Sequence, residues 1–95
     1  MHTLEQLRSG ALRGARHLKL AEGLVVFPPE ILSLKETLEV LDLTGNQLSS
    51  LPDALAEFSK LRIIFCSENN FTELSQVLGR CPALTMVGFK ANRIA

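Results

Sequence analysis

The chain has 95 residues, of which 46% are hydrophobic and 21% charged, as expected for one small globular domain. Ten Lys and Arg balance ten Asp and Glu, so the sequence offers no strong basic field for nucleic acid or an anionic membrane. No uninterrupted apolar run reaches the about 18 residues that a transmembrane helix needs. We therefore expect neither a nucleic-acid partner nor a membrane partner.

The N-terminal stretch predicts a short capping helix over residues 3–13. Thr3 and Gln6 have the spacing of a capping box, and leucines follow at helix-like spacing up to the glycines at 10 and 14. The stretch is charged and lacks the apolar segment of a signal peptide, which favours a cytoplasmic protein. Residues 1–14 are therefore expected to cover the first edge of a core.

The rest of the chain contains a 23-residue repeat. LEVLDLTGNQL, LRIIFCSENNF and LTMVGFKANRI align as L-x-x-L-x-L-x-x-N-x-L, and the first two continue as SSLPDALAEFSK and TELSQVLGRCPA. A degenerate copy, ARHLKLAEGLVVFPPEILSLKET, precedes them with one residue missing near Gly23. Periodicity of this kind predicts a single solenoid domain. Its predicted parts are a capping helix (1–14), a degenerate repeat (15–37), two full repeats (38–60 and 61–83) and a truncated repeat (84–95).

Each repeat predicts one short parallel strand followed by a helical turn. Inward strand residues such as Leu41 and Ile64 are expected to stack on one another, because each repeat buries its core against its neighbours. The asparagine that ends each strand is expected to be structural, since its amide can bond free backbone groups in the adjoining turns. These asparagines are Asn46, Asn69 and Asn92.

The second halves of the repeats also have apolar residues in register, with Leu51 matching Leu74. Pro52 is expected at the first position of a helical turn, where proline is favoured. Ser75 takes its place in the next copy and is a candidate N-cap. These halves therefore predict helical turns with one apolar face toward the core.

The two cysteines occupy positions that are apolar in the repeat. Cys66 takes the place of Leu43 and Cys81 that of Phe58, so both are expected to be buried, reduced thiols. A zinc site would need more ligands at closer spacing, and a cytoplasmic location disfavours a disulfide. Motifs for phosphate binding, zinc proteolysis, nucleophile activation or dinucleotide binding are absent. We therefore expect no catalytic site, no metal and no cofactor.

The repeat resembles the leucine-rich repeat family in its 23-residue intracellular type, over residues 15–95. The resemblance implies an α/β solenoid, with short parallel strands on a concave face and helical turns and loops on a convex face. It also implies a protein or peptide partner on the concave face. The segments LEQLRSGALRGARHLKL and LRIIFCSENNFTELSQVLGRCPALTMVGFKANRI are similar to the N-terminal repeats of bacterial leucine-rich repeat proteins that carry a protein-kinase-like domain. No kinase motif lies in this chain.

Strand residues between the core positions point to the concave face by two-residue alternation. One row then reads His17, Val40, Ile63 and Met86, and the next reads Lys19, Asp42, Phe65 and Gly88. An apolar cluster on an exposed face predicts an interaction surface, with Phe65 as its anchor. The alternative is that β-branched residues here reflect strand propensity alone. The predicted partner-binding residues are Val40, Asp42, Thr44, Ile63, Phe65, Ser67, Met86 and Lys90.

The sequence stops halfway through the fourth copy, at Arg93-Ile94-Ala95. The last strand would then be a bare edge, and such edges pair with other chains. We expect either a fragment of a longer protein or self-association through the uncapped C-terminal end. Two alternatives to a binding module stay open, namely a structural N-terminal piece of a larger solenoid and a regulatory region of a kinase-like protein.

Overall fold

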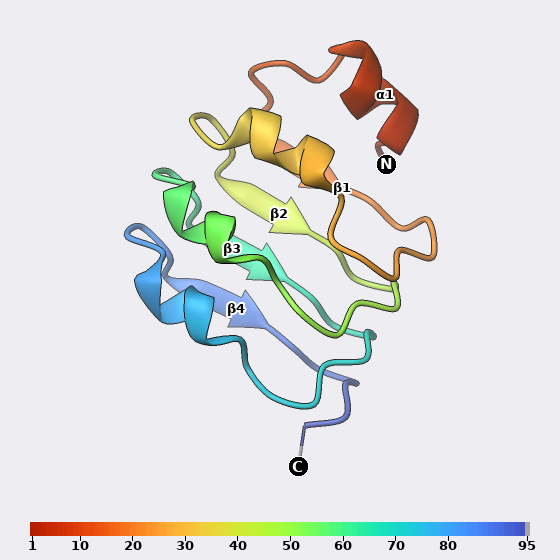
Figure 1. Ribbon diagram of the computed structural model, residues 1–95, viewed down its shortest axis with the longest axis vertical. Helices are drawn as coiled ribbons and strands as arrows, with labels where there is room; N and C mark the ends of the chain where they lie inside the picture. The colour runs from red at the N-terminus through yellow and green to blue at the C-terminus, as the bar shows by residue number, and fades with distance from the viewer. Residues whose placement is uncertain (95) are drawn as a thin grey trace.

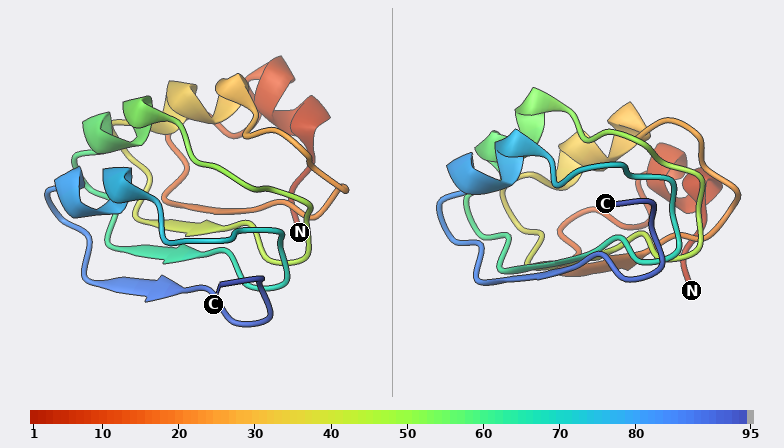
Figure 2. Two further views of the ribbon diagram at one scale, coloured as in Figure 1. Left: turned by 60° about the horizontal axis from the view of Figure 1, so that its bottom comes forward. Right: turned by 90° about the horizontal axis from the view of Figure 1, so that it is seen from below.

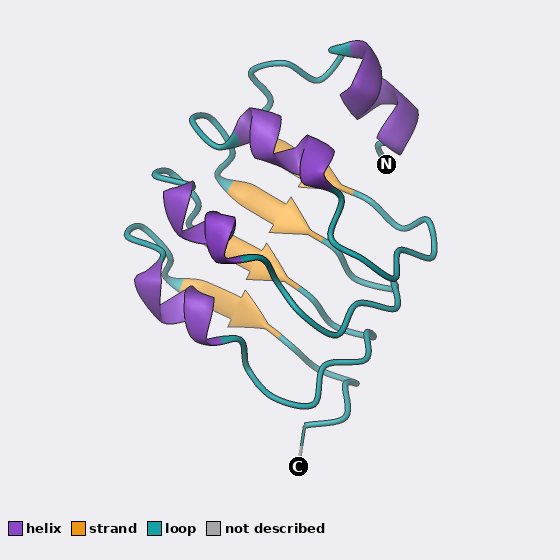
Figure 3. Ribbon diagram, viewed as in Figure 1, coloured by secondary structure: helices purple, strands orange, loops and turns teal. Residues whose placement is uncertain are grey.

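The structure is a computed structural model that describes residues 1–94 (Figure 1). Strands alternate with short helical segments along the chain (Figure 3). Four strands form one parallel sheet in the order β1-β2-β3-β4, which confirms the predicted solenoid. The elements are α1 (Leu4–Ser9), β1 (His17–Lys19), β2 (Val40–Asp42), β3 (Ile63–Phe65) and β4 (Met86–Gly88), with the 3-10 helices η1 (Pro29–Leu34), η2 (Asp53–Glu57) and η3 (Gln76–Arg80).

The sheet and the helices form two layers with the hydrophobic core between them (Figure 2). Leu18, Leu41 and Ile64 are register partners on successive strands, and all three are buried. Val87 continues this row on β4 but is 41% exposed, because β4 is the last strand of the described sheet. Each repeat therefore gains its core from its neighbours, as the periodicity predicts.

The predicted asparagine ladder is present. Asn69 accepts a hydrogen bond at Oδ1 from the backbone N–H of Leu48 (2.9 Å). Its Nδ2 donates to the carbonyls of Leu43 (2.9 Å) and Cys66 (3.1 Å). Asn46 and Asn92 bond the same kinds of group one repeat before and one repeat after. Each amide thus joins the turn of its own repeat to the repeat before it.

The capping helix is shorter than the prediction of residues 3–13. Thr3 and Gln6 form the predicted capping box, but α1 ends at Ser9. Gly10 follows with a φ of 83°, a left-handed conformation that glycine adopts readily and that ends the helix. Ahead of the helix, His2 pairs with the free edge of β1: its N–H donates to the Lys19 carbonyl (2.9 Å), and its Nδ1 accepts from the Lys19 N–H (3.1 Å). The N-terminal segment therefore covers both the first edge of the sheet and the first end of the core.

The helical side departs from expectation where its segments begin. Pro52 lies one residue before η2, in an extended conformation, and not at the first helical position. Ser75 occupies the predicted N-cap position of η3, but its side chain makes no capping hydrogen bond. Leu74, which matches the half-buried Leu51 in register, is 54% exposed. It faces the open end of the solenoid beside Leu84, where none of the described elements packs on it. Val77 is buried in the last helical segment.

Both cysteines are free and buried, as predicted. Burial raises the pKa of the Cys66 thiol to about 12, and the negative charge of Asp42 adds to that shift. Burial also raises the pKa of Cys81, whose Sγ lies 3.4 Å from the Val77 carbonyl. In the part of the chain that the structure describes, no helix has both the length and the apolar character to cross a bilayer.

Candidate interaction surface on the outer face of the sheet

The sheet face opposite the 3-10 helices carries two ordered rows of side chains. The register confirms both predicted rows across β1, β2, β3 and β4. Burial alternates along β2 and β3, where the central residue is buried and the two flanking residues are half-buried. The flanking side chains therefore form the outer surface. The rows are His17, Val40, Ile63 and Met86, and then Lys19, Asp42, Phe65 and Gly88.

An apolar cluster lies toward the β4 side of this face. We call Val40, Ile63, Phe65 and Met86 the sheet-face patch. Met86 is 52% exposed, and the other three side chains are half-buried. Phe65 lies against Gly88 on the neighbouring strand, where a Cβ atom would approach its Cδ1 to 3.0 Å. The missing side chain at Gly88 thus leaves room for the ring to lie across β4.

Polar residues lie at the ends of the strands that carry the sheet-face patch. Asp42 accepts a hydrogen bond at Oδ1 from the N–H of Thr44 (3.0 Å), which orients its carboxylate at the end of β2. Ser67 accepts at Oγ from the N–H of Lys90 (3.2 Å), which ties the ends of β3 and β4 together. The register thus places Val40, Asp42, Ile63, Phe65 and Met86 on one face, and Ser67 Oγ lies 3.8 Å from a Cβ position at Gly88. Thr44 and Lys90 follow β2 and β4 in the chain.

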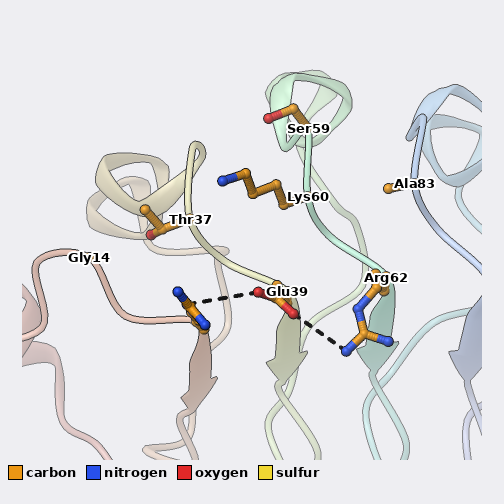
Figure 4. Close-up of a pocket in the computed structure, with 8 residues that line it drawn as sticks. Gly14, Thr37, Glu39, Ser59, Lys60, Arg62 and Ala83 are labelled. Carbon is orange, nitrogen blue, oxygen red and sulfur yellow. Dashed lines mark hydrogen bonds and ion pairs between the residues drawn. The ribbon is translucent and has the colours of Figure 1, made fainter.

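A groove that the sequence did not predict lies at the edge where the strands begin (Figure 4). Glu39 lies between two arginines: its Oε2 is 3.9 Å from Nε of Arg16, and its Oε1 is 3.5 Å from Nη2 of Arg62. Lys60 lines the same groove, which has a volume of about 540 Å³. The signal that could have revealed it is the 23-residue spacing of Arg16, Glu39 and Arg62. The other lining residues are Gly14, Thr37, Ser59 and Ala83.

Comparison with known proteins agrees with this geometry. Residues 37–58 match the sequence profile of the family described as Leucine Rich Repeat. Most of the chain also superposes on a leucine-rich repeat protein of Leptospira interrogans with a TM-score of 0.76. The fold is a leucine-rich repeat fold.

The Leptospira protein is 19% identical in sequence, so the likeness concerns the fold. The match covers 94% of this chain and 29% of the Leptospira protein, so the chain spans less than a third of that protein's length. Comparison with curated protein sequences gave no significant match.

The matched leucine-rich repeat segment contains no catalytic domain. Within residues 1–94, His, Cys, Asp and Glu side chains form no cluster of three or more that could hold a metal ion. Two features of the described residues could contact a partner, namely the apolar sheet-face patch and the charged groove at the start of the strands.

Proposed function

We propose that the chain is a leucine-rich repeat interaction module that binds a protein or peptide on the outer face of its sheet. One observation carries the proposal: within the apolar sheet-face patch, the Phe65 ring lies against Gly88 on β4, the strand that also carries the exposed Met86 side chain. Aromatic residues and methionine are enriched in the cores of protein interfaces. A partner side chain would cover the sheet-face patch and exclude water from it.

Strand propensity explains only part of the sheet-face patch. Val40 and Ile63 are β-branched, and such residues are common in strands whatever the strand contacts. Phe65 and Met86 are not β-branched, and together they extend the apolar surface across β3 and β4. Phe65 is the best anchor, because large aromatic side chains near the centre of an interface carry much of its binding energy.

The proposal can be tested with a peptide library displayed on phage and selected on the intact chain. Peptides that bind should lose roughly 30-fold in affinity on Phe65→Ala, which corresponds to the 2 kcal/mol typical of an interface anchor. Val26→Ala is the matched control, because Val26 is an exposed apolar residue on a loop away from the strands. Equal affinity for the wild type and Phe65→Ala would contradict the proposal, as would an equal loss in Val26→Ala.

We also propose that the module works in a reducing compartment and next to a further domain. Two free, buried cysteines support a reducing compartment such as the cytoplasm. The similarity to the N-terminal repeats of bacterial kinase-like proteins supports a role in bringing substrates or regulators to a further domain. Co-expression with such a domain and a pull-down with the Phe65→Ala variant would test that role.

Self-association is a second candidate function, favoured by the edge of β4. An open, largely apolar groove of about 430 Å³ lies beside the outer edge of β4, which pairs with no other described strand. Its lining includes Val87, Leu74 and Met86. Unpaired strand edges are ready to pair with another chain. Light scattering with refractive-index detection suits a chain without Trp or Tyr. Val87→Asp should dissociate an oligomer formed through this edge, and Phe65→Asp should leave it intact; the reverse result would assign the contact to the sheet-face patch.

A further inference from the structure

The proposed function does not account for the charged groove at the start of the strands. We propose that this groove, lined by Arg16, Glu39, Lys60 and Arg62, binds an acidic side chain of the partner. The partner is then a peptide segment with Asp or Glu close to the apolar residue that covers the patch. This inference rests on the proposed function and specifies the chemistry of its ligand.

The groove is positively charged although the chain is neutral. Three cationic side chains and one carboxylate line it, which leaves an excess of two positive charges in one small region. The chain as a whole has ten basic and ten acidic residues. Local charge of one sign attracts ligands of the opposite sign and orients them as they approach.

The positively charged side chains of the groove make few contacts with other residues of the protein. Arg16 approaches Glu39 at 3.9 Å, and its side chain is 78% exposed. Arg62 forms a 3.5 Å contact with the same carboxylate and is 52% exposed. Lys60 has no ion pair among the described residues. Each guanidinium has five N–H donors, so most donors in the groove are free to bind a second carboxylate.

The backbone under these side chains is well fixed. The N–H groups of Glu39 and Val40 both donate to the Arg16 carbonyl, at 2.7 and 3.0 Å. Those of Arg62 and Ile63 both donate to the Glu39 carbonyl, at 2.8 and 3.1 Å. A rigid base lowers the entropy lost when the charged side chains bind a ligand.

The groove lies at the start of the same strands that carry the sheet-face patch. Glu39 precedes Val40 in the chain, and Arg62 precedes Ile63, so charged and apolar sites lie one residue apart on two neighbouring strands. An extended peptide advances about 3.3 Å per residue, and adjacent strands lie about 4.8 Å apart. A single short segment can therefore place an apolar side chain on the patch and an acidic one in the groove.

Glu39 limits the groove to an excess of two positive charges. It is 28% exposed and lies between the two arginines, so any anion that enters the groove meets its negative charge. The whole chain has ten basic and ten acidic residues, so it offers no strong basic field for the many charges of a polyphosphate or nucleic-acid backbone. A small groove of three cations and one anion therefore suits a single acidic side chain.

The test is a titration of the isotope-labelled chain with hexaglutamate, followed by the amide NMR signals at about 20 mM salt, where screening is weak. Hexaglutamine is the neutral control peptide, and inorganic tripolyphosphate tests the phosphate alternative. We expect hexaglutamate to shift signals at residues 14–16, 37–39 and 59–62. Preferential binding of tripolyphosphate, or an equal response to hexaglutamine, would overturn the inference.

Charge variants sharpen this test because they act in opposite directions. Arg16→Gln and Arg62→Gln should each weaken hexaglutamate binding about twofold to fivefold, the range expected for exposed ion pairs. Glu39→Gln should strengthen it by a similar factor, because it removes the competing carboxylate. Arg93→Gln and Glu5→Gln are matched controls that change the same charges on exposed residues outside the groove. Weaker binding to Glu39→Gln than to wild type would overturn the inference.

The selected phage peptides separate the two proposals. If their affinity falls with Phe65→Ala and also with Arg62→Gln, both proposals hold. If it falls only with Phe65→Ala, the sheet-face patch is the binding site and the acidic-ligand inference is wrong. If hexaglutamate binds the groove while no selected peptide depends on Phe65, the groove is confirmed and the proposed function is wrong.

Discussion

The ring of Phe65 lies directly against the backbone of Gly88, its register partner on β4. A Cβ atom at residue 88 would lie 3.0 Å from Cδ1 and 3.7 Å from Cε1 of that ring. Both atoms belong to one rigid ring, so the side chain can yield only by rotating as a whole. The absence of a side chain at Gly88 therefore determines where the ring of Phe65, the proposed anchor, can lie.

Gly88→Ala should lift the Phe65 ring and destabilise the fold by about 1 kcal/mol, the lower end of the range for overpacking. Urea unfolding followed by circular dichroism measures the change. Gly79→Ala is the matched control, because nothing lies within 4 Å of a Cβ atom there. Gly79 lies in η3, so alanine should be neutral or slightly stabilising at that position. Equal effects of the two variants would show that the ring does not press on Gly88.

Asn69→Ala should destabilise the fold by about 3 kcal/mol, because a buried backbone group left without its partner costs 1–3 kcal/mol. Asn69 accepts from one backbone N–H and donates to the carbonyls of Leu43, Cys66 and Ser67. Removing the amide leaves several of these groups unsatisfied between two repeats. The free energy of unfolding in urea measures the loss.

Asn70→Ala is the control for that substitution. Asn70 is the exposed neighbour of the buried Asn69, and surface substitutions usually change stability by less than about 0.5 kcal/mol. If Asn69→Ala cost no more than Asn70→Ala, the asparagines would be spacers in the turn and not the hydrogen-bonding links between repeats.

The sequence predicted those features that depend on periodicity. A 23-residue spacing combined with two-residue alternation determines which side of each strand is buried, so the rows ending in Met86 and Gly88 followed directly. Asn69 was also predictable, since a polar residue at a fixed place in a buried turn must bond the backbone.

Features that depend on the ends of elements were harder to predict. The end of α1 depends on the left-handed conformation of Gly10, and the exposure of Leu74 depends on what packs on the last repeat. The groove of Arg16 and Arg62 was missed because equal spacing does not show on which edge side chains meet. The end of α1, the exposure of Leu74 and the groove all depend on how residues are placed in the tertiary structure.

The Cys66 thiol should make the fold less stable in alkali. Its pKa is about 12 in the folded chain against an ordinary value of 9.0, so the unfolded chain loses the proton first. The stability linked to Cys66 is therefore fully present below pH 9.0 and is lost as the pH rises toward about 12. The free energy of unfolding in urea is measured for the wild type and for Cys66→Ala between pH 9.0 and about 12. Comparing the two proteins removes the contribution of Lys titration, because both contain the same lysines. A pH dependence that is identical in both proteins would contradict the assignment.

The ion pair between Arg8 and Glu30 should link the capping helix to the first repeat in a pH-dependent way. Nε of Arg8 lies 2.6 Å from Oε2 of Glu30, and this hydrogen bond holds the pKa of the carboxylate below its ordinary value of 4.5. Because the pKa is lowered in the folded chain, the stabilisation is present above pH 4.5 and is lost as the pH falls through the lowered value.

Glu30→Gln tests this pair by removing the charge while keeping the shape of the side chain. The melting temperature of Glu30→Gln should lie below that of the wild type near neutral pH, and the difference should shrink as the solution is acidified below pH 4.5. Salt should shrink it as well, since exposed ion pairs are screened. Glu5→Gln is the control, because Glu5 is an exposed carboxylate of α1, the helix that carries Arg8, and has no ion pair among the described residues. A difference that persists unchanged at low pH would show that Glu30 acts through packing and not through its charge.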